Sequence, residues 1–423
     1  MADTTLVELA IASLNHRGEG LAKGKIGATR LAYTLPGERV LARFEGENAR
    51  LVEILEASPE RIAPICRHFG DCGGCAAQHM SASLYAEWKR GVLSRALVRA
   101  GVGADVGPLI DAHGEGRRRA TFHARFGAGG LAVGFMQARA HRIAAIEDCP
   151  ILAPSMSKAL AAARVLAGVL RQLGRPLDLS ATASLGGLDI DIRGAGEFDF
   201  SVRRELIAAA AELDLSRLSN HGDILIERRA PEILMGLATV VPPSGFFLQP
   251  TAEGERALAA LAMEAIDGER VADLFAGVGA FALRLAERHS VHAVEIQSAA
   301  LDALTRAARR TPGVRPISVE TRDLFQRPLT KRELSRFDAV VFDPPRAGAA
   351  AQTAEIAASQ VPRVIAVSCD PGTFARDART LVDGGYRLEQ TTAIDQFRFS
   401  PHLEIVGVFS RGKPAKRTRS VLG

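Results

Sequence analysis

One cysteine lies at a junction between two predicted elements. Cys369 follows the apolar run 363–367 and precedes Asp370 and Pro371. The run predicts a buried strand, and the proline predicts the start of a helix, whose N-terminus favours negative charge. We therefore expect a thiol at a strand end, where a thiolate nucleophile could be stabilised. A lone cysteine is more often a small buried hydrophobe, so neighbouring residues have to support this interpretation.

Asp343 supports it. This residue follows the apolar run 338–342 and precedes Pro344 and Pro345. The carboxyl ends of parallel strands share one edge of a sheet, and ligands of open α/β sheets bind there. An Asp-Pro-Pro sequence after a strand, together with a nucleoside loop, is typical of methyltransferases that act on nucleic-acid bases or protein side chains.

A glycine turn predicts that nucleoside loop. Asp273 lies in one predicted strand, Gly277 and Gly279 lie in the turn after it, and Glu295 ends the next strand. Glycines let a ligand approach the backbone, and a carboxylate about 20 residues further on can hold two ribose hydroxyls. A dinucleotide fingerprint would have a third glycine where this chain has Ala282, so S-adenosylmethionine is favoured over NAD. Packing of a tight turn is the alternative.

A thiol beside a methyl donor indicates covalent catalysis on a pyrimidine. Carbon-5 of uracil is too weak a nucleophile to take a methyl group from sulfur, but thiolate addition at carbon-6 makes it enolate-like. A base must then remove the carbon-5 proton so that the thiolate can leave. Glu404, which follows Pro401-His402-Leu403, is the candidate base. Otherwise, a lone glutamate on an edge hairpin is a surface residue.

Together these segments resemble the RNA uracil-5 methyltransferases, which are class I enzymes that use S-adenosylmethionine. The resemblance is carried by residues 273–279, 342–348, 368–371 and 401–404. It implies Cys369 as nucleophile and Glu404 as base. The positions that it implies around the cofactor or the uracil are Gln249, Phe275, Gly277, Gly279, Ala280, Glu295, Asp323 and Asp343. Ala280 and Thr251 replace asparagines of the family, which predicts that some polar contacts to the cofactor are missing.

The four other cysteines have the spacing of a metal site. They are Cys66, Cys72, Cys75 and Cys149. Four thiolates suit either zinc or a [4Fe-4S] cluster, and His68 and His79 could also bind zinc. The family resemblance, through these cysteines and Pro150, implies the cluster, with zinc as the alternative. We expect this group to shape residues 59–150 into an RNA-binding surface.

The pattern of elements divides the chain into three folded units. From 253 to 412 strands and helices alternate, which predicts a Rossmann-like class I methyltransferase domain with a doubly wound sheet. Two closing strands near 390–397 and 403–409 have no helix between them and should form an antiparallel hairpin at the sheet edge. Residues 59–252 predict an α+β domain, and residues 413–423 a basic flexible tail.

The first unit, residues 1–58, alternates short apolar stretches with glycine turns and predicts a small β-barrel. Its segments 15–20 and 35–38 resemble a TRAM domain, which implies RNA binding. A barrel with a purely structural role is the alternative, because a fold does not determine a function.

Charge and composition are consistent with an RNA-binding protein. Lys and Arg number 53 against 48 Asp and Glu, and basic residues gather at Arg117, Arg118 and Arg119 and in the segment 411–419. No run of about 20 apolar residues and no signal-peptide pattern occurs, so we expect a cytoplasmic protein. In that compartment, its cysteines should be thiols or metal ligands.

These observations predict an enzyme that methylates carbon-5 of a uridine in ribosomal or transfer RNA, with ribosomal RNA favoured. We expect a monomer that acts on an unpaired or extruded base. One alternative is a cytosine-5 methyltransferase, which usually has a cysteine beside the proline where this chain has Asp343-Pro344-Pro345. Another is a non-catalytic RNA-binding iron–sulfur protein, against which the retained thiol and carboxylate argue.

Overall fold

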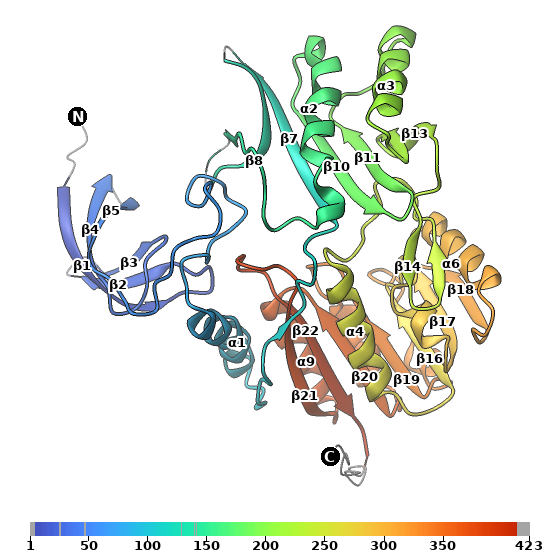
Figure 1. The fold of residues 1–423 in the computed structure, drawn as a ribbon. Helices are drawn as coiled ribbons and strands as arrows, with labels where there is room; N and C mark the ends of the chain where they lie inside the picture. Colours follow the sequence, from blue (N-terminus) through green and yellow to red (C-terminus); the bar gives the residue numbers. More distant parts are fainter. Residues whose placement is uncertain are drawn as a thin grey trace, which may run out of the picture.

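The chain folds into three units that follow one another in sequence (Figure 1). The computed structural model describes residues 5–24, 27–45, 48–127, 129–138, 140 and 142–412. The predicted basic tail at 413–423 lies outside the described residues. Within those described parts, no helix has the length and apolar character needed to cross a membrane.

The first unit is an antiparallel five-stranded sheet curved into a half-barrel, in the order β3-β2-β1-β4-β5. Its strands are β1 (Thr5–Leu14), β2 (Gly20–Gly24), β3 (Gly27–Leu31), β4 (Arg39–Glu45) and β5 (Asn48–Glu56). Alternate residues of these strands, among them Leu9, Ile11 and Val40, form a small core. Gly18 of the turn after β1 packs on Trp88, and Trp88 Nε1 donates to Asn15 O at 2.9 Å. The predicted small barrel is therefore found as a half-barrel that docks on a helix of the next unit.

The central unit is an α+β domain, as predicted. Its seven-stranded sheet has the order β13-β12-β11-β10-β7-β8-β9. The strands are β7 (Arg119–Gly127), β8 (Gly130–Met136), β9 (Ile143–Ala144), β10 (Leu177–Ser184), β11 (Gly187–Arg193), β12 (Arg217–Asn220) and β13 (Asp223–Glu227). Two helices, α2 (Ala159–Val169) and α3 (Phe200–Glu212), contact each other and cover the sheet. Every second residue of β10 is buried, which is the period of a strand with one covered face.

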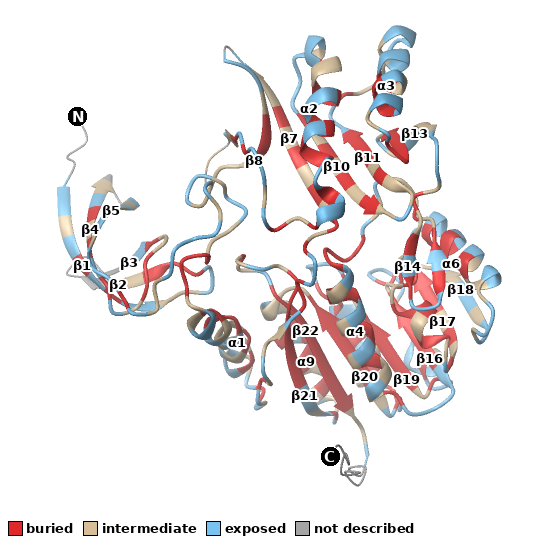
Figure 2. Cartoon of the chain, viewed as in Figure 1, coloured by how far each residue is buried: buried red, intermediate tan, exposed pale blue. Residues whose placement is uncertain are grey.

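The third unit is a doubly wound sheet of eight strands in the order β18-β17-β16-β19-β20-β22-β21-β6. Its strands are β6 (Ile110–Asp111), β16 (Arg270–Leu274), β17 (Ser290–Glu295), β18 (Ile317–Thr321), β19 (Ala339–Phe342), β20 (Arg363–Ser368), β21 (Arg387–Asp395) and β22 (Glu404–Ser410). Its helices are α4 (Ala252–Ala265), α5 (Ala282–Leu285), α6 (Ser298–Arg310), α7 (Lys331–Leu334), α8 (Ala350–Ala357) and α9 (Pro371–Asp383). The inner strands are buried along most of their length (Figure 2). The predicted class I methyltransferase fold is confirmed.

The closing hairpin of β21 and β22 is antiparallel, as predicted, but it is not the outermost part of the sheet. Strand β22 lies between β20 and β21, and the two residues of β6 pair in parallel with Ile394 and Asp395. A strand from the first third of the chain therefore forms the edge.

Helix α1 (Ala82–Arg99) also packs against the third unit. Its Leu93 and Leu97 share a buried cluster with Phe374 and Leu381 of α9. The short hairpin of β14 (Ile233–Met235) and β15 (Ala238–Val240) joins the core on the other face. Parts of residues 59–252 thus build the catalytic domain, and the predicted boundaries at 58, 252 and 412 stay predictions.

Candidate active site

The strand order places the candidate site at one edge of the sheet. From β16 the chain winds through β17 and β18 on one side, and through β19 and β20 on the other. Leu274 pairs with Phe342 in adjacent parallel strands, so Phe275 and Asp343 leave the sheet side by side. A crevice at such a switch point is where open α/β sheets bind ligands.

The register of the hairpin brings Cys369 and Glu404 to the same edge. Ser368, the last residue of β20, pairs with Ile405 of the antiparallel strand β22. Cys369 therefore leaves the sheet beside Glu404, although 35 residues separate them in sequence. Because β22 runs opposite to its neighbour, its first residue lies at the carboxyl ends of the parallel strands.

The surroundings of Cys369 disfavour its thiolate. Burial first, and then the carboxyls of Glu404 and Asp343, raise the pKa of the Cys369 thiol to about 11, and Arg346 acts in the opposite direction. The next residue, Asp370, caps α9, and its Oδ1 accepts from Thr373 N at 2.8 Å. The expected stabilisation of a thiolate by that helix stays a prediction.

A buried carboxyl, Glu404, and a half-buried one, Asp343, lie near the thiol. Burial raises the pKa of Asp343 to about 7, opposed by a hydrogen bond from Gln249. Burial, and then the nearby Asp343, raise the pKa of Glu404 well above its ordinary value. Glu404 is therefore a strong base when it is ionised, and it is a buried residue rather than the surface residue of the alternative interpretation.

The glycine turn has the geometry of a nucleoside site. Glu295 accepts from Gly277 N at 3.1 Å and from the amides of Ile296 and Gln297 at 2.9 and 3.0 Å. These bonds fix its carboxylate at the end of β17. Gly279 has a φ of +97°, and a Cβ there would lie 2.4 Å from Leu304 Cδ1, so the turn needs glycine.

One of the two departures from the family pattern, Thr251, has a structural role here. Thr251 is fully buried and caps α4, because its Oγ1 accepts from Gly254 N at 2.9 Å and donates to Ala112 O at 2.7 Å. The carbonyl of Ala280 accepts from Arg284 at 2.8 Å. Thr251 therefore stabilises a helix start rather than contacting a cofactor.

Asp323 lies in the loop after β18, and its Oδ1 accepts from Phe325 N at 2.9 Å. The ring of Phe325 lies 5.5 Å from that of Phe275, which has a left-handed φ of +62°. The two rings therefore contact each other beside the turn where a nucleoside would bind, and Glu295 and Asp323 lie at and just after the ends of β17 and β18.

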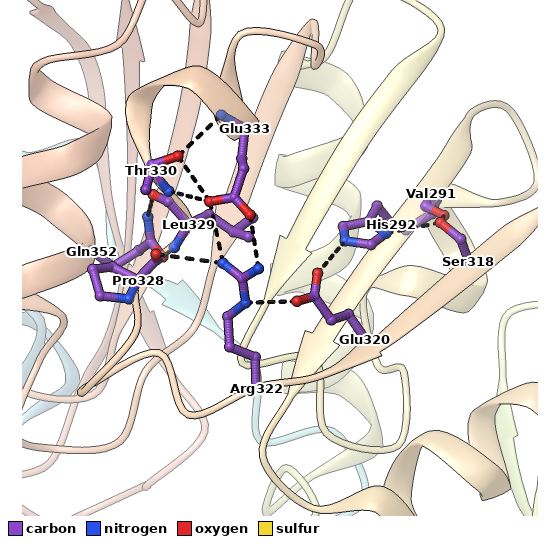
Figure 3. Close-up of polar contacts among 10 residues, drawn as sticks. All are labelled: Val291, His292, Ser318, Glu320, Arg322, Pro328, Leu329, Thr330, Glu333 and Gln352. Carbon is purple, nitrogen blue, oxygen red and sulfur yellow. Dashed lines mark hydrogen bonds and ion pairs between the residues drawn. The ribbon is translucent and has the colours of Figure 1, made fainter.

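A polar network holds this loop (Figure 3). Arg322 donates to Glu320 at 2.6 Å and to Glu333 at 2.7 Å, and Glu333 also closes the capping box of α7 with Thr330. The hydrogen bond from Arg322 contributes most to lowering the pKa of Glu333 to about 2. Gln352 fastens the far end of the loop through Leu329 N at 2.8 Å. Arg322, which directly precedes Asp323, is thus bonded to Glu320, Glu333 and the carbonyl of Pro328.

Two arginines of the triplet, Arg118 and Arg119, hold the segment around Gln249. Arg119 Nη1 donates to Leu248 O at 3.0 Å, Arg118 Nε to Gln249 O at 3.1 Å, and Arg118 N to Pro250 O at 2.9 Å. Arg118 is buried and paired with Glu255 at 2.5 Å. The expectation that the triplet holds RNA is wrong for Arg118, which clamps the segment that carries Gln249.

The end of β21 and the loop that follows it contain residues that sequence reasoning missed. Gln396 is fully buried, and Asp395 is paired with Lys89 of α1 at 3.0 Å. Phe399 has a left-handed φ of +62°, its amide donates to Tyr85 Oη at 2.8 Å, and its carbonyl accepts from residues 76 and 77. The sequence offered one indication of these residues, which is that two polar residues directly follow Ile394 at the end of a predicted strand.

The four clustered cysteines line one cavity of about 350 Å³, together with His68, Arg117 and Arg398. Burial raises the pKa of Cys75 to about 12 and also raises those of Cys72 and Cys149. His79 is not among the lining residues; it packs on Phe69 with ring centroids 5.5 Å apart. In the part of the chain that the structure describes, no group of three His, Cys, Asp or Glu side chains is placed to hold a single metal ion.

Comparisons with known proteins agree with this geometry. The family described as tRNA (Uracil-5-)-methyltransferase matches residues 242–412. An RNA methyltransferase of Brucella suis biovar 1 is 44% identical over 98% of this chain and 100% of its own length. The 23S rRNA (uracil(1939)-C(5))-methyltransferase RlmD of Halomonas elongata is 34% identical over 97% of this chain and 90% of its own length.

The chain belongs to the RNA uracil-5 methyltransferase family. The predicted class of S-adenosylmethionine-dependent RNA methyltransferase is thereby confirmed. The crystal structure of the Pyrococcus abyssi tRNA (uracil-54, C5)-methyltransferase in complex with S-adenosyl-L-homocysteine superposes with a TM-score of 0.73 at 21% identity, covering 95% of this chain and 99% of that one. This superposition shows that the three-unit fold is shared.

Proposed function

We propose that this methyltransferase acts through a temporary bond between Cys369 and carbon-6 of the target uracil, with Glu404 as the base. The observation that carries the proposal is the register that places Cys369 beside Glu404 at the switch-point edge of the sheet. Asp343 and the glycine turn open onto the same edge. A nucleophile, a base and a nucleoside site therefore meet in one place.

The proposed cofactor site is built by the turn after β16. S-adenosylmethionine supplies the methyl group, attached to a positively charged sulfur. Glu295 is held by three backbone amides and would accept from the ribose hydroxyls, as carboxylates at this place in related sheets do. The proposed contacts around the cofactor and the uracil are Gln249, Phe275, Gly277, Gly279, Ala280, Glu295, Asp323 and Asp343.

The first step is deprotonation of the thiol and its addition to the ring. Because the pKa of Cys369 is raised to about 11, we expect the thiolate to form with the substrate bound. Arg346 is the cation that favours the thiolate there. The thiol proton passes to water and the sulfur bonds to carbon-6, which moves the electrons of the C5–C6 double bond onto the ring as an enolate. Those electrons then form the bond between carbon-5 and the methyl group, while the bond from the methyl group to the cofactor sulfur breaks and leaves a neutral thioether.

The second step releases the product. Glu404 accepts the proton from carbon-5, the electrons of that C–H bond restore the ring double bond, and the bond between carbon-6 and sulfur breaks. The raised pKa of Glu404 makes its carboxylate a stronger base than an exposed glutamate. Since this step requires the carboxylate, its rate is expected to rise with pH through that raised pKa.

We infer that the substrate is ribosomal RNA rather than transfer RNA. The inference rests on the relative that is 34% identical over nearly the whole chain, which is a 23S rRNA methyltransferase by name. The half-barrel and the central unit would contact the RNA, and the reacting uracil would be unpaired or extruded. We also infer a cytoplasmic monomer.

We propose a [4Fe-4S] cluster held by Cys66, Cys72, Cys75 and Cys149. The cavity that these residues line offers four thiols around a shared space of about 350 Å³. In a cubane each iron takes one cysteine, whereas zinc needs all ligands about 2.0–2.3 Å from one ion. Support for the cluster comes from the shared cavity, which all four thiols line. Its role would be structural.

The test is methylation of total RNA from a strain that lacks the gene. With tritiated S-adenosylmethionine, the wild-type enzyme is expected to restore one 5-methyluridine in 23S rRNA, and RNA carrying 5-fluorouridine is expected to become trapped on Cys369. Cys369→Ala should abolish both. Transfer to transfer RNA would overturn the substrate assignment, and unchanged turnover by Cys369→Ala would overturn the covalent reaction.

A further inference from the structure

A buried glutamine links two groups of the proposed active site. Gln396 follows β21, and its side chain has no exposed surface. Its Nε2 donates to Gln249 Oε1 at 2.6 Å and to Glu404 Oε1 at 3.1 Å. One amide nitrogen carries two hydrogens, so both bonds can form at once. Gln396 therefore bridges the proposed base and the glutamine that faces Asp343.

The bridge fixes the direction of a longer chain of hydrogen bonds. Gln249 uses its oxygen to accept from Gln396, so its Nε2 must point the other way, where it donates to Asp343 Oδ2 at 3.1 Å. If the amide of Gln249 were turned over, two donors would face each other at Gln396 and two acceptors at Asp343. The orientation of Gln249 is thus set by the amide of Gln396.

The neighbouring helix leaves space for the Gln396 side chain, and one carboxyl oxygen of Glu404 has no hydrogen-bond partner among the described residues. A Cβ at Gly254 of α4 would lie 2.3 Å from Gln396 Oε1, so that position accommodates the amide only as glycine. Among the described residues, neither Glu404 Oε2 nor Gln396 Oε1 has a hydrogen-bond partner. Oε1 of Glu404 therefore accepts from Gln396, and Oε2 remains available to accept a proton.

We propose that Gln396 is a positioning residue that holds Glu404 with one oxygen free to take the carbon-5 proton. The inference rests on the proposed function, since it assigns Glu404 the second step. Gln396 does not touch the reacting atoms. It orients the carboxyl group of Glu404 through the hydrogen bond to Oε1. Proton transfer requires heavy atoms about 2.6–3.2 Å apart, and loss of such alignment costs up to about 100-fold in rate.

The test uses Gln396→Met, which keeps an unbranched chain of similar length and removes both donors. In a single turnover with tritiated S-adenosylmethionine and total RNA from the deletion strain, methylated RNA bound to protein is expected to persist on denaturing gels. Its resolution should slow about tenfold or more, and by a larger factor than methyl transfer. Gln390→Met, the same substitution at an exposed site on β21, should behave as wild type.

A pH profile distinguishes positioning from a merely structural effect. The hydrogen bond from Gln396 lowers the pKa of Glu404, so its removal should move the rise in the resolution rate to higher pH. Should Gln396→Met fail to fold, Gln396→Asn retains an amide that is one methylene too short to reach both partners, and the same delay is expected.

Two results would overturn the inference while the proposed function stands. One is equal resolution of the adduct by wild type and variant. The other is a proportional loss of methyl transfer and resolution with an unchanged pH profile. Absence of any Cys369 adduct in the wild-type enzyme would instead refute the proposed covalent reaction, and this inference with it.

Discussion

The environment of Cys369 predicts how an alkylating reagent reacts with it in the free enzyme. An ordinary cysteine thiol has a pKa near 9, and burial beside two carboxyls raises the pKa of this one to about 11. Iodoacetamide reacts with the thiolate. The rate of alkylation at Cys369 should therefore keep rising tenfold per pH unit up to pH 10, where an ordinary thiol has already levelled off.

The expected magnitude combines two opposing effects. At pH 8, a pKa higher by about two units lowers the thiolate fraction roughly 100-fold. A more basic thiolate is also a better nucleophile, by roughly tenfold for the same difference. Cys369 in the folded enzyme should then react about tenfold more slowly at pH 8 than the same cysteine in the unfolded chain.

The assay is alkylation followed by peptide mass spectrometry, which resolves Cys369 from the four other cysteines. The urea-unfolded protein provides the reference rate for the same residue. Glu404→Gln removes a neighbouring negative charge and should accelerate alkylation, because Glu404 is the larger charge contribution to the raised pKa. A rate that levels off at or below pH 9 in the folded enzyme would refute the reasoning.

Three further substitutions test the supports of the site. Lys89→Met leaves Asp395 buried without its cation and should lower the free energy of unfolding by about 3–5 kcal/mol in a urea titration. Arg322→Ala should lower it by about 1–3 kcal/mol and accelerate hydrogen exchange in residues 322–330, whereas Arg332→Ala, at an exposed position of α7, should change neither. Gly279→Ala should cost about 2 kcal/mol and weaken S-adenosylmethionine binding in calorimetry, because its Cβ would strike Leu304.

Each of these has a result that would contradict it. A loss below about 1 kcal/mol for Lys89→Met would mean that the ion pair contributes little beyond its own desolvation. Equal exchange in the Arg322 and Arg332 variants would mean that the loop does not depend on the network. The control for Gly279→Ala is Gly313→Ala, because Gly313 also has a left-handed φ but a Cβ there meets no atom within 4 Å. Equal losses of unfolding free energy at both positions would mean that the contact with Leu304 does not cause the loss.

The positions of Cys369, Asp343 and the glycine turn could be predicted because each follows a continuous apolar run. Such runs identify buried parallel strands, and strand ends share an edge. Glu404 could be placed there too, since a hairpin without a helix must reverse direction. Local pattern was sufficient for these residues because their neighbours in sequence determine their position.

The supports of the site could not be predicted in the same way. Gln396, Lys89 and Arg118 matter through partners that lie far away in sequence, such as Asp395 for Lys89. A buried polar residue in a strand or helix pattern gives no indication of its partner. The raised pKa of Cys369 was missed for the same reason. The helix that follows it can be read from adjacent residues, but its burial and its neighbours Glu404 and Asp343 come from distant segments.

The edge strand β6 has a consequence for biogenesis. Its two residues pair with Ile394 and Asp395, and α1 just before it rests on α9. During synthesis the first quarter of the polypeptide leaves the ribosome well before the segment on which it must dock. Those early residues must therefore wait, with apolar side chains such as Leu93 and Leu97 uncovered, until translation has nearly ended. Maturation of this enzyme should accordingly be slow and dependent on chaperones, since a contact spanning nearly 300 residues closes last.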